Sequence, residues 1–301
     1  MTSTAQERWL PIGAIAVTLF FWASAFVAIR HLGEEVSPGA LSLGRLLIGS
    51  LVLGAFLLAR PRRWPARGDW PAILTCGVLW FGIYNLALNE GERRVDAGTA
   101  AMLIQIAPIL IAVLAAIFLR EKMTWYLGVG LLLAFSGVCL IGFSASGDGS
   151  RDVVGVVLCL VAAAAYAVSM VAQKPLLGRL SALEVTWFAC TIGTIVCLPF
   201  SADLVQTVQS IPLSSVGWIL YLGVFPTAVA FTTFAYVLGR MDASKLGVTT
   251  YLVPPITILL GWLFLREVPP ALAVAGGVIC LLGVAVSRIT PHSRDRQLER
   301  A

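Results

Sequence analysis

Ten apolar runs, each close to the length of a membrane-spanning helix, follow one another along the 301 residues of this chain. A helix needs about 20 apolar residues to cross the hydrocarbon core of a bilayer, so ten such helices would use roughly 200 residues. No run alternates apolar and polar residues as a membrane β-barrel does, so we expect the spanning elements to be helices. The expected spans are Trp9–Ile29, Gly39–Ala59, Trp70–Leu88, Ala97–Leu119, Thr124–Phe143, Val153–Val171, Ala182–Phe200, Ile211–Leu238, Leu246–Leu265 and Ala271–Val286.

Charged residues are too scarce for a water-soluble protein. They make up 12% of the chain, against roughly 25% in typical soluble domains, and 58% of the residues are hydrophobic. Disordered chains combine low hydrophobicity with high charge, so the composition excludes that class as well. About 100 residues remain outside the spans, which is too few for a sizeable soluble domain. The sequence therefore predicts an all-α integral membrane protein with ten transmembrane helices.

The basic residues are sorted between the two sides of the expected membrane. Fifteen Lys and Arg fall on the side of the N-terminus, the even-numbered loops and the C-terminal tail, and five fall on the other side. Because cytoplasmic loops carry the excess of Lys and Arg, we expect both termini in the cytoplasm, which an even number of spans allows. The net charge of +5 then reflects topology, and we expect no nucleic-acid partner.

The chain repeats itself. Shifting it by 146 residues aligns Val95–Val138 on Met241–Val284 without a gap. With a shift of 144 residues, Val27-Ala28-Ile29-Arg30 meets Val171-Ala172-Gln173-Lys174. The clearest matches in the first alignment are Asp96-Ala97 with Asp242-Ala243, Pro108 with Pro254, Phe118-Leu119-Arg120-Glu121 with Phe264-Leu265-Arg266-Glu267, Gly130 with Gly276, and Gly137 with Gly283.

Each repeat contains five expected spans. Because five is odd, the two halves must lie upside down relative to each other in the membrane. Such inverted repeats are a design of transporters, in which two similar units can close alternately on either side of a central site. We expect a first repeat at 1–147, a second, inverted repeat at 148–290, and a cytoplasmic tail at 291–301.

The residues of the repeat also carry a family resemblance. An aromatic and small-residue stretch in the first span is followed by an Arg in the second. Each half then has a small-residue and Pro stretch that runs into Glu before a Gly-x6-Gly helix. These segments are Trp22-Ala23-Ser24-Ala25-Phe26, Arg45, Ala97–Glu121 and Ala243–Glu267. Over nearly its whole length the chain resembles the drug/metabolite transporter superfamily, in its ten-helix branch with two EamA-type repeats.

That resemblance implies a multi-pass protein of the cell inner membrane that exports amino acids, related metabolites or drugs. In length and aromatic content the chain is similar to the aromatic amino acid exporters of that branch. One feature departs from a simple duplication, because Ala189 stands in the second half where Arg45 stands in the first.

Prolines lie in the middle of the fourth and ninth expected spans. Pro108 lies in the fourth, and Pro254 and Pro255 lie in the ninth. A proline inside a helix lacks the N–H donor and clashes with the carbonyl four residues back. The carbonyls freed in this way would belong to Ile104, Thr250 and Tyr251. Free carbonyls at membrane depth are tolerated where they line a cavity or are buried in protein. We expect these kinks to serve gating, with Gln105 and Tyr251 in the binding site beside them, or to be structural only.

Aromatic side chains on three spans predict a binding pocket. On the sixth span, Tyr166, Ser169 and Met170 share one helical face, and the equivalent face of the first span carries Trp22. The third span adds Tyr84 and Asn85. Together these residues would line a pocket for a small, partly apolar ligand. The alternative for each aromatic residue is packing in the core or at the membrane interface.

Arg45 is the one clearly intramembrane charge of the sequence. Such charges are costly and are candidates for function. It would lie about 9 Å inside the outer end of its span, within reach of the interface by snorkelling. We therefore leave open whether Arg45 ties helices together or contacts the carboxylate of a ligand.

The favoured function is export of amino acids, neutral or aromatic, and related small metabolites by alternating access. No acid lies in the middle of a span, so the sequence offers no proton carrier, yet drug or metabolite efflux by proton antiport stays an alternative. A membrane-embedded lipid-linked transferase is a remote one, because no catalytic arrangement or metal-ligand spacing occurs. We expect no enzyme activity, cofactor or metal. The expected partners are the small-molecule substrate and the lipid bilayer, with the protein a monomer or homodimer.

Overall fold

The computed structural model describes residues 3–32, 35–59, 61, 63–94, 103–145, 153–265, 271–287 and 289. Within these residues all regular structure is helical, as expected. The principal helices are α1 (Ser3–Leu32), α2 (Pro38–Leu58), α3 (Trp70–Thr75), α4 (Tyr84–Glu92), α6 (Ala107–Phe118), α7 (Trp125–Ala145), α8 (Val153–Gln173), α9 (Ala182–Cys197), α10 (Ser201–Ser210), α11 (Leu213–Leu222), α12 (Ala230–Leu238), α13 (Ala243–Thr249), α14 (Val253–Leu265) and α15 (Ala271–Ser287). The shorter turns are η1 (Arg67–Asp69), η2 (Cys76–Ile83), η3 (Lys174–Gly178), η4 (Leu198–Phe200), η5 (Gly223–Val229) and η6 (Thr250–Leu252).

Seven helical stretches in the described chain are long and apolar enough to cross a membrane. Three shorter apolar helices accompany them: Ala107–Phe118, Trp125–Leu140 and Val274–Ser287. Each of these stretches falls on one of the runs expected from sequence, and part of the fourth run, residues 97–102, lies outside the described residues. One element was not anticipated: the connection between the seventh and eighth runs forms the helix α10.

Equivalent serines begin the second helix of each repeat. The hydroxyl oxygen of Ser37 accepts a hydrogen bond from the Ala40 N–H at the start of α2. The hydroxyl oxygen of Ser181, 144 residues later, accepts one from the Glu184 N–H at the start of α9. Such caps satisfy N–H groups that have no partner within the helix. The repeat is therefore visible in local structure as well as in sequence.

The third and eighth spans both contain a π-helical segment, η2 and η5, at equivalent positions of the repeat. The wider turns of a π-helix disturb the usual ladder of backbone hydrogen bonds, and polar side chains bond to carbonyls in η2 and directly before η5. The amide of Asn85 donates to the carbonyl oxygens of Trp80 and Phe81, and the hydroxyl of Thr227 donates to that of Leu222 at 2.8 Å.

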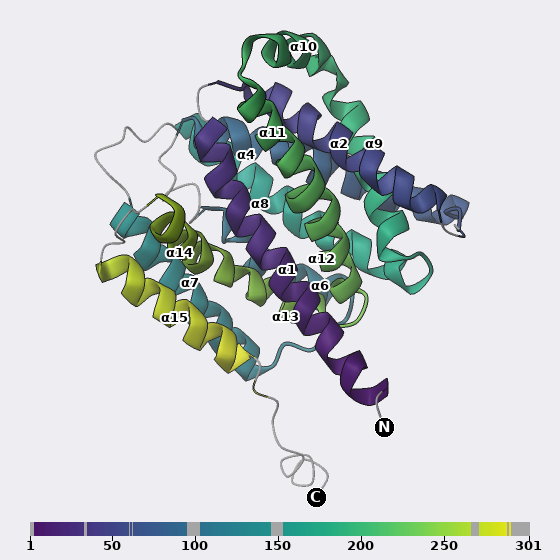
Figure 1. The fold of residues 1–301 in the computed structure, drawn as a ribbon. Coiled ribbons are helices and arrows are strands. Elements are labelled where there is room, and N and C mark those ends of the chain that lie inside the picture. Colours follow the sequence, from purple (N-terminus) through teal and green to yellow (C-terminus); the bar gives the residue numbers. More distant parts are fainter. Residues whose placement is uncertain are drawn as a thin grey trace, which may run out of the picture.

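The last helices of the two repeats, α7 and α15, lie side by side (Figure 1). A Cβ atom added at Gly130 would lie 2.6 Å from the carbonyl oxygen of Gly283, and one at Gly137 would lie 2.6 Å from that of Gly276. Gly130 corresponds to Gly276 in the repeat, and Gly137 corresponds to Gly283. The contact of Gly130 with Gly283 is therefore equivalent to the contact of Gly276 with Gly137. The pair is therefore antiparallel and self-complementary, as in a two-fold interface. Equivalent helices that run in opposite directions are what an inverted repeat requires.

The same relation holds deeper in the bundle. A Cβ atom at Gly77 would lie 3.0 Å from the carbonyl oxygen of Ala189, and one at Gly223 would lie 2.9 Å from that of Arg45. These positions correspond under the shifts of 146 and 144 residues. The glycines let η2 approach α9 and η5 approach α2 at backbone distance. The start of α1 and the end of α15 lie at the same end of the bundle (Figure 1).

Candidate functional site

A cavity of about 90 Å³ lies where spans of both repeats meet. Its lining comes from α1, α2, η2, α4, the turn before α6, α8, α12, η6 and α14. The lining residues are Trp22, Ala25, Phe26, Ile29, Arg45, Trp80, Tyr84, Leu88, Ile104, Gln105, Tyr166, Phe231, Thr250 and Val253. The cavity is therefore mostly apolar and aromatic, with a few polar groups, which is the usual make-up of a small-molecule site.

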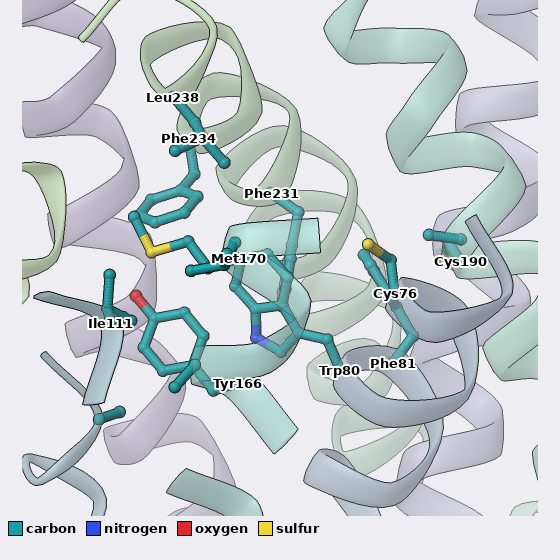
Figure 2. Close-up of a cluster of buried hydrophobic side chains, with 14 of the residues drawn as sticks. Cys76, Trp80, Phe81, Ile111, Tyr166, Met170, Cys190, Phe231, Phe234 and Leu238 are labelled. Carbon is teal, nitrogen blue, oxygen red and sulfur yellow. The ribbon is translucent and has the colours of Figure 1, made fainter. Parts of the chain in front are cut away.

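Aromatic rings form most of the wall. The rings of Trp80 and Tyr166 stack with centroids 4.9 Å apart, and Phe231 meets Trp80 edge-on at 5.0 Å. Trp22 packs edge-on against Phe231 at 5.4 Å, and Tyr84 lies 6.1 Å from Tyr166. Figure 2 shows Trp80, Tyr166 and Phe231 converging from different helices. These separations are those of favourable aromatic pairs, so the wall is a rigid surface for an apolar ligand group.

Arg45 brings a positive charge to the cavity from α2. Arg45 is 6% exposed, and its Nε–H donates to the hydroxyl oxygen of Thr227 at 3.1 Å. That hydroxyl in turn donates to the carbonyl oxygen of Leu222, the last residue of α11 before η5. Arg45 is thus held against the second repeat while it lines the cavity, so the structure supports the helix-tie reading and is compatible with ligand contact.

Two polar atoms of the wall are buried without a hydrogen-bond partner in the described chain. They are Nε1 of Trp22 and the hydroxyl oxygen of Tyr166. A buried donor without a partner costs free energy unless water or a ligand satisfies it. Both atoms belong to residues that line the cavity.

The two interrupted spans meet at the cavity. Pro108 lies in the first turn of α6, after a turn that contains Gln105. Pro254 and Pro255 lie in the first turn of α14, after the 3-10 turn η6. The Gln105 side chain donates to the carbonyl oxygen of Thr250 at 3.3 Å. The prolines thus mark breaks between helical pieces, and residues beside each break line the cavity.

The expected site residues divide into two groups. Trp22, Tyr84, Gln105, Tyr166 and Arg45 line the cavity together. The other four, Asn85, Ser169, Met170 and Tyr251, are buried behind it. Asn85 bonds to the carbonyls of η2, Met170 packs in the main core, and Tyr251 packs in a separate cluster with Leu127 and Cys280.

Phe231 is a wall residue that the sequence pattern did not point to. It stands 146 residues after Asn85, so the repeat itself would have identified it as a candidate.

Glu121 is a second residue that the sequence pattern did not mark as functional. Sequence placed it at a helix end, and the structure buries its side chain to 8% exposure in a contact with Lys174. In the described part of the chain no group of three or more His, Cys, Asp or Glu could hold a metal ion.

A bundle of apolar helices, built from two related halves around an aromatic cavity, defines a multi-pass membrane transporter. Residues 9–143 and 153–289 each match the EamA-like transporter family. The chain belongs to that family, and the resemblance to drug/metabolite transporters expected from its sequence is confirmed.

Relatives of this chain are also named as transporters. The chain is 36% identical to a probable terminal-alkyne amino-acid exporter of Streptantibioticus cattleyicolor, over 95% of this chain and 96% of that protein. It is 35% identical to the uncharacterized transporter YdfC of Bacillus subtilis, over 91% and 90% of the two chains. A solved crystal structure matches with a TM-score of 0.75 at 21% identity, over 95% of this chain and 97% of that one, which shows the shared fold. The named relatives are transporters, and no catalytic family is indicated.

Proposed function

We propose that this transporter exports amino acids, neutral or aromatic, and related small metabolites by alternating access of its cavity to the two sides of the membrane. The observation that carries the proposal is the cavity: both repeats line it, aromatic rings wall it, and a guanidinium stands at its edge. A mostly apolar pocket with few polar groups suits a small solute with an apolar body. The name of the relative from Streptantibioticus cattleyicolor points to the same class of solute.

Arg45 is the proposed partner of the solute's carboxylate. A guanidinium binds a carboxylate through short, charge-assisted hydrogen bonds. The bond from its Nε to Thr227 fixes the orientation of the group before a solute arrives. The unpartnered Nε1–H of Trp22 is a further donor at the same wall. Trp80, Tyr84 and Tyr166 would then receive the solute's apolar side chain, with Gln105 as a polar neighbour.

The four expected site residues behind the cavity wall would act by positioning the residues that line it. Asn85 holds the carbonyls of η2 and thereby the position of Trp80. Ser169 and Met170 share α8 with Tyr166, and Tyr251 directly follows Thr250. We infer that these four position the lining, and that Pro108, Pro254 and Pro255 mark the places where the interrupted spans bend during gating.

The units 1–147 and 148–290 would be the two moving halves, with 291–301 as a tail. We place the protein in the cell inner membrane. Because Lys and Arg are concentrated in cytoplasmic loops, the end of the bundle where α1 begins would face the cytoplasm. The cavity residues Ile29 and Leu88 then lie toward the outer ends of their helices. The structure would accordingly correspond to a state that opens outward.

Reconstitution tests the proposal. The full-length protein is incorporated into liposomes, and flux is measured for a panel of amino acids, each with and without a pH gradient. We expect saturable flux of at least one neutral or aromatic amino acid without a gradient. Flux that requires the gradient would favour the proton-antiport alternative. No solute-dependent flux across the whole panel would contradict the export function.

A further inference from the structure

Glu121 makes a buried contact between the two halves at one end of the bundle. Its carboxylate accepts hydrogen bonds from the backbone N–H of Ala243 at 2.6 Å, from the N–H of Ser244 at 3.0 Å, and from the Ser244 hydroxyl at 2.7 Å. The ammonium of Lys174 lies 3.3 Å from the same carboxylate. Hydrogen bonds with an ionised partner are about twice as strong as neutral ones. Glu121 therefore ties the first repeat firmly to the start of α13 in the second.

The helix α13 is not capped by the acid of its own half, Asp242. Asp242 occupies the position before α13, where an Asp ordinarily accepts from the first free N–H groups. Its side chain makes no such bond. It pairs instead with Lys245 at 2.9 Å, and both side chains are partly exposed. Because an acid from the other half takes the capping role, these N–H groups of α13 have their side-chain acceptor only while the two halves touch.

Lys174 completes the connection. It follows α8, and its ammonium also donates to the carbonyl oxygen of Met241. One carboxylate and one ammonium thus join three connections: the one after α6, the one after α8 and the one before α13. We call Glu121, Lys174, Met241, Ala243 and Ser244 the latch.

The latch lies beyond the closed end of the cavity. Lys174 comes eight residues after Tyr166 along α8, which is ~12 Å of helix. Between these levels Met170, Phe234 and Leu238 fill the core, and Figure 2 shows Met170 between the rings of Tyr166 and Phe234. The void that Phe234 and Thr249 line has no room for a water molecule. The path from the cavity to this end of the bundle is therefore blocked first by packed side chains and then by the latch.

We propose that the latch holds this end of the bundle closed and must open before the cavity can be reached from this side. Weakening the carboxylate removes bonds that the closed state makes and an open state does not need, so the balance moves toward opening. The inference rests on the alternating access proposed above, and it is independent of which solute is carried.

The sequence repeat relates three residues of the latch to residues of the other half. The corresponding pairs are Glu121 with Glu267, Lys174 with Arg30, and Ala243 with Ala97. Glu267 and Ala97 lie outside the described residues.

Thiol labelling of the full-length protein in proteoliposomes tests the latch. Thr249→Cys places a reporter thiol in the blocked path, and Lys122→Cys, at an exposed position next to Glu121, identifies the membrane face that carries the latch. A membrane-impermeant maleimide is added to one face at a time, and the chain with its six native cysteines gives the background. With Glu121→Gln, we expect the reporter to react at least about tenfold faster from the latch face, the lower end of what one charge-assisted hydrogen bond contributes, and no faster from the other face.

Matched substitutions make the result specific. Lys174→Gln should raise the same rate, whereas Lys245→Gln, the identical change in the exposed pair on α13, should leave it unchanged, and Glu267→Gln should not raise it. An unchanged rate in both Glu121→Gln and Lys174→Gln overturns the latch. An equal rise from both faces also overturns it, because that result reports a loosened fold. Because labelling needs no solute, these outcomes test the latch alone. The export function is tested separately by the flux measured after reconstitution.

Discussion

The side chain of Gln105 donates a hydrogen bond of 3.3 Å to the backbone carbonyl of Thr250. That carbonyl cannot receive the usual helical bond from residue 254, because proline has no N–H. It accepts from the N–H of Val253 in a tighter turn and from Gln105 across the repeats. The two interrupted spans, one from each half, are therefore joined at the wall of the cavity.

Gln105→Leu should uncouple the interrupted spans. It keeps the approximate size of the side chain and removes the bond to Thr250, so we expect the free energy of unfolding to fall by about 1 kcal/mol and the initial rate of amino-acid flux to fall as well. Thermal unfolding in detergent and flux in liposomes measure the two effects. Gln209→Leu, the same change at an exposed position of α10, is the control. Equal flux in the two variants would contradict a role for this bond in transport.

Arg45→Gln should discriminate between solutes by their carboxylate. Loss of a charge-assisted pair is worth about 1.5–3 kcal/mol, or roughly 10- to 100-fold in affinity. We expect the affinity for L-phenylalanine to fall by that factor, and the affinity for its uncharged-carboxyl analogue, phenylalanine amide, to stay near its parental value. Quenching of the fluorescence of Trp22 and Trp80, which line the cavity, measures both.

Thr227→Val separates orientation from charge. It removes the acceptor of the Arg45 Nε–H but leaves the guanidinium in place, so its effect on L-phenylalanine should be smaller than that of Arg45→Gln. If Arg45→Gln weakened the acid and the amide equally, Arg45 would be a tie between helices and not the carboxylate partner.

The helices could be located from sequence because membrane spans are set by length and apolarity, which are local properties. The runs around α1, α2 and α8, and the repeat that relates Gly130 to Gly276, needed no tertiary information. The helix α10 was missed because it is not a span. The π-helical segments were missed because a change from 3.6 residues per turn leaves no trace in an apolar run.

The candidate site was found in part for the same reason. Trp22 and Tyr166 line the cavity from regular α-helices, α1 and α8. Asn85 was expected beside Tyr84, but its amide turns to the carbonyls of Trp80 and Phe81. Tyr251 was expected beside the proline break, but it is its neighbour Thr250 in the 3-10 turn η6 that lines the cavity. Glu121 could not be recognised at all, because its partners are 122 and 123 residues away in sequence.

Two tyrosines test the division between the wall and the residues behind it. Tyr166→Ala removes the ring that stacks on Trp80, so we expect lower solute affinity and lower flux from protein that still folds. Tyr251→Ala removes a fully buried ring from the separate cluster around Cys280. It should cost about 3–5 kcal/mol of stability, and Tyr251→Phe, which keeps the ring, should restore normal flux. Unchanged solute affinity in Tyr166→Ala would remove the wall assignment.

Glycines on α7 test the contact that joins the two repeats. In Gly137→Ala the new methyl group would meet the backbone oxygen of Gly276 at 2.6 Å, and because backbone cannot yield, the helices must separate at a cost of about 1–3 kcal/mol. Gly128→Ala is the matched control on the same helix, since nothing lies within 4 Å of its added Cβ atom. There the gain in helix propensity should raise stability by up to about 1 kcal/mol. Thermal unfolding followed by tryptophan fluorescence should therefore shift in opposite directions for the two variants, and a shift in the same direction would show that close approach of α7 and α15 does not hold the halves together.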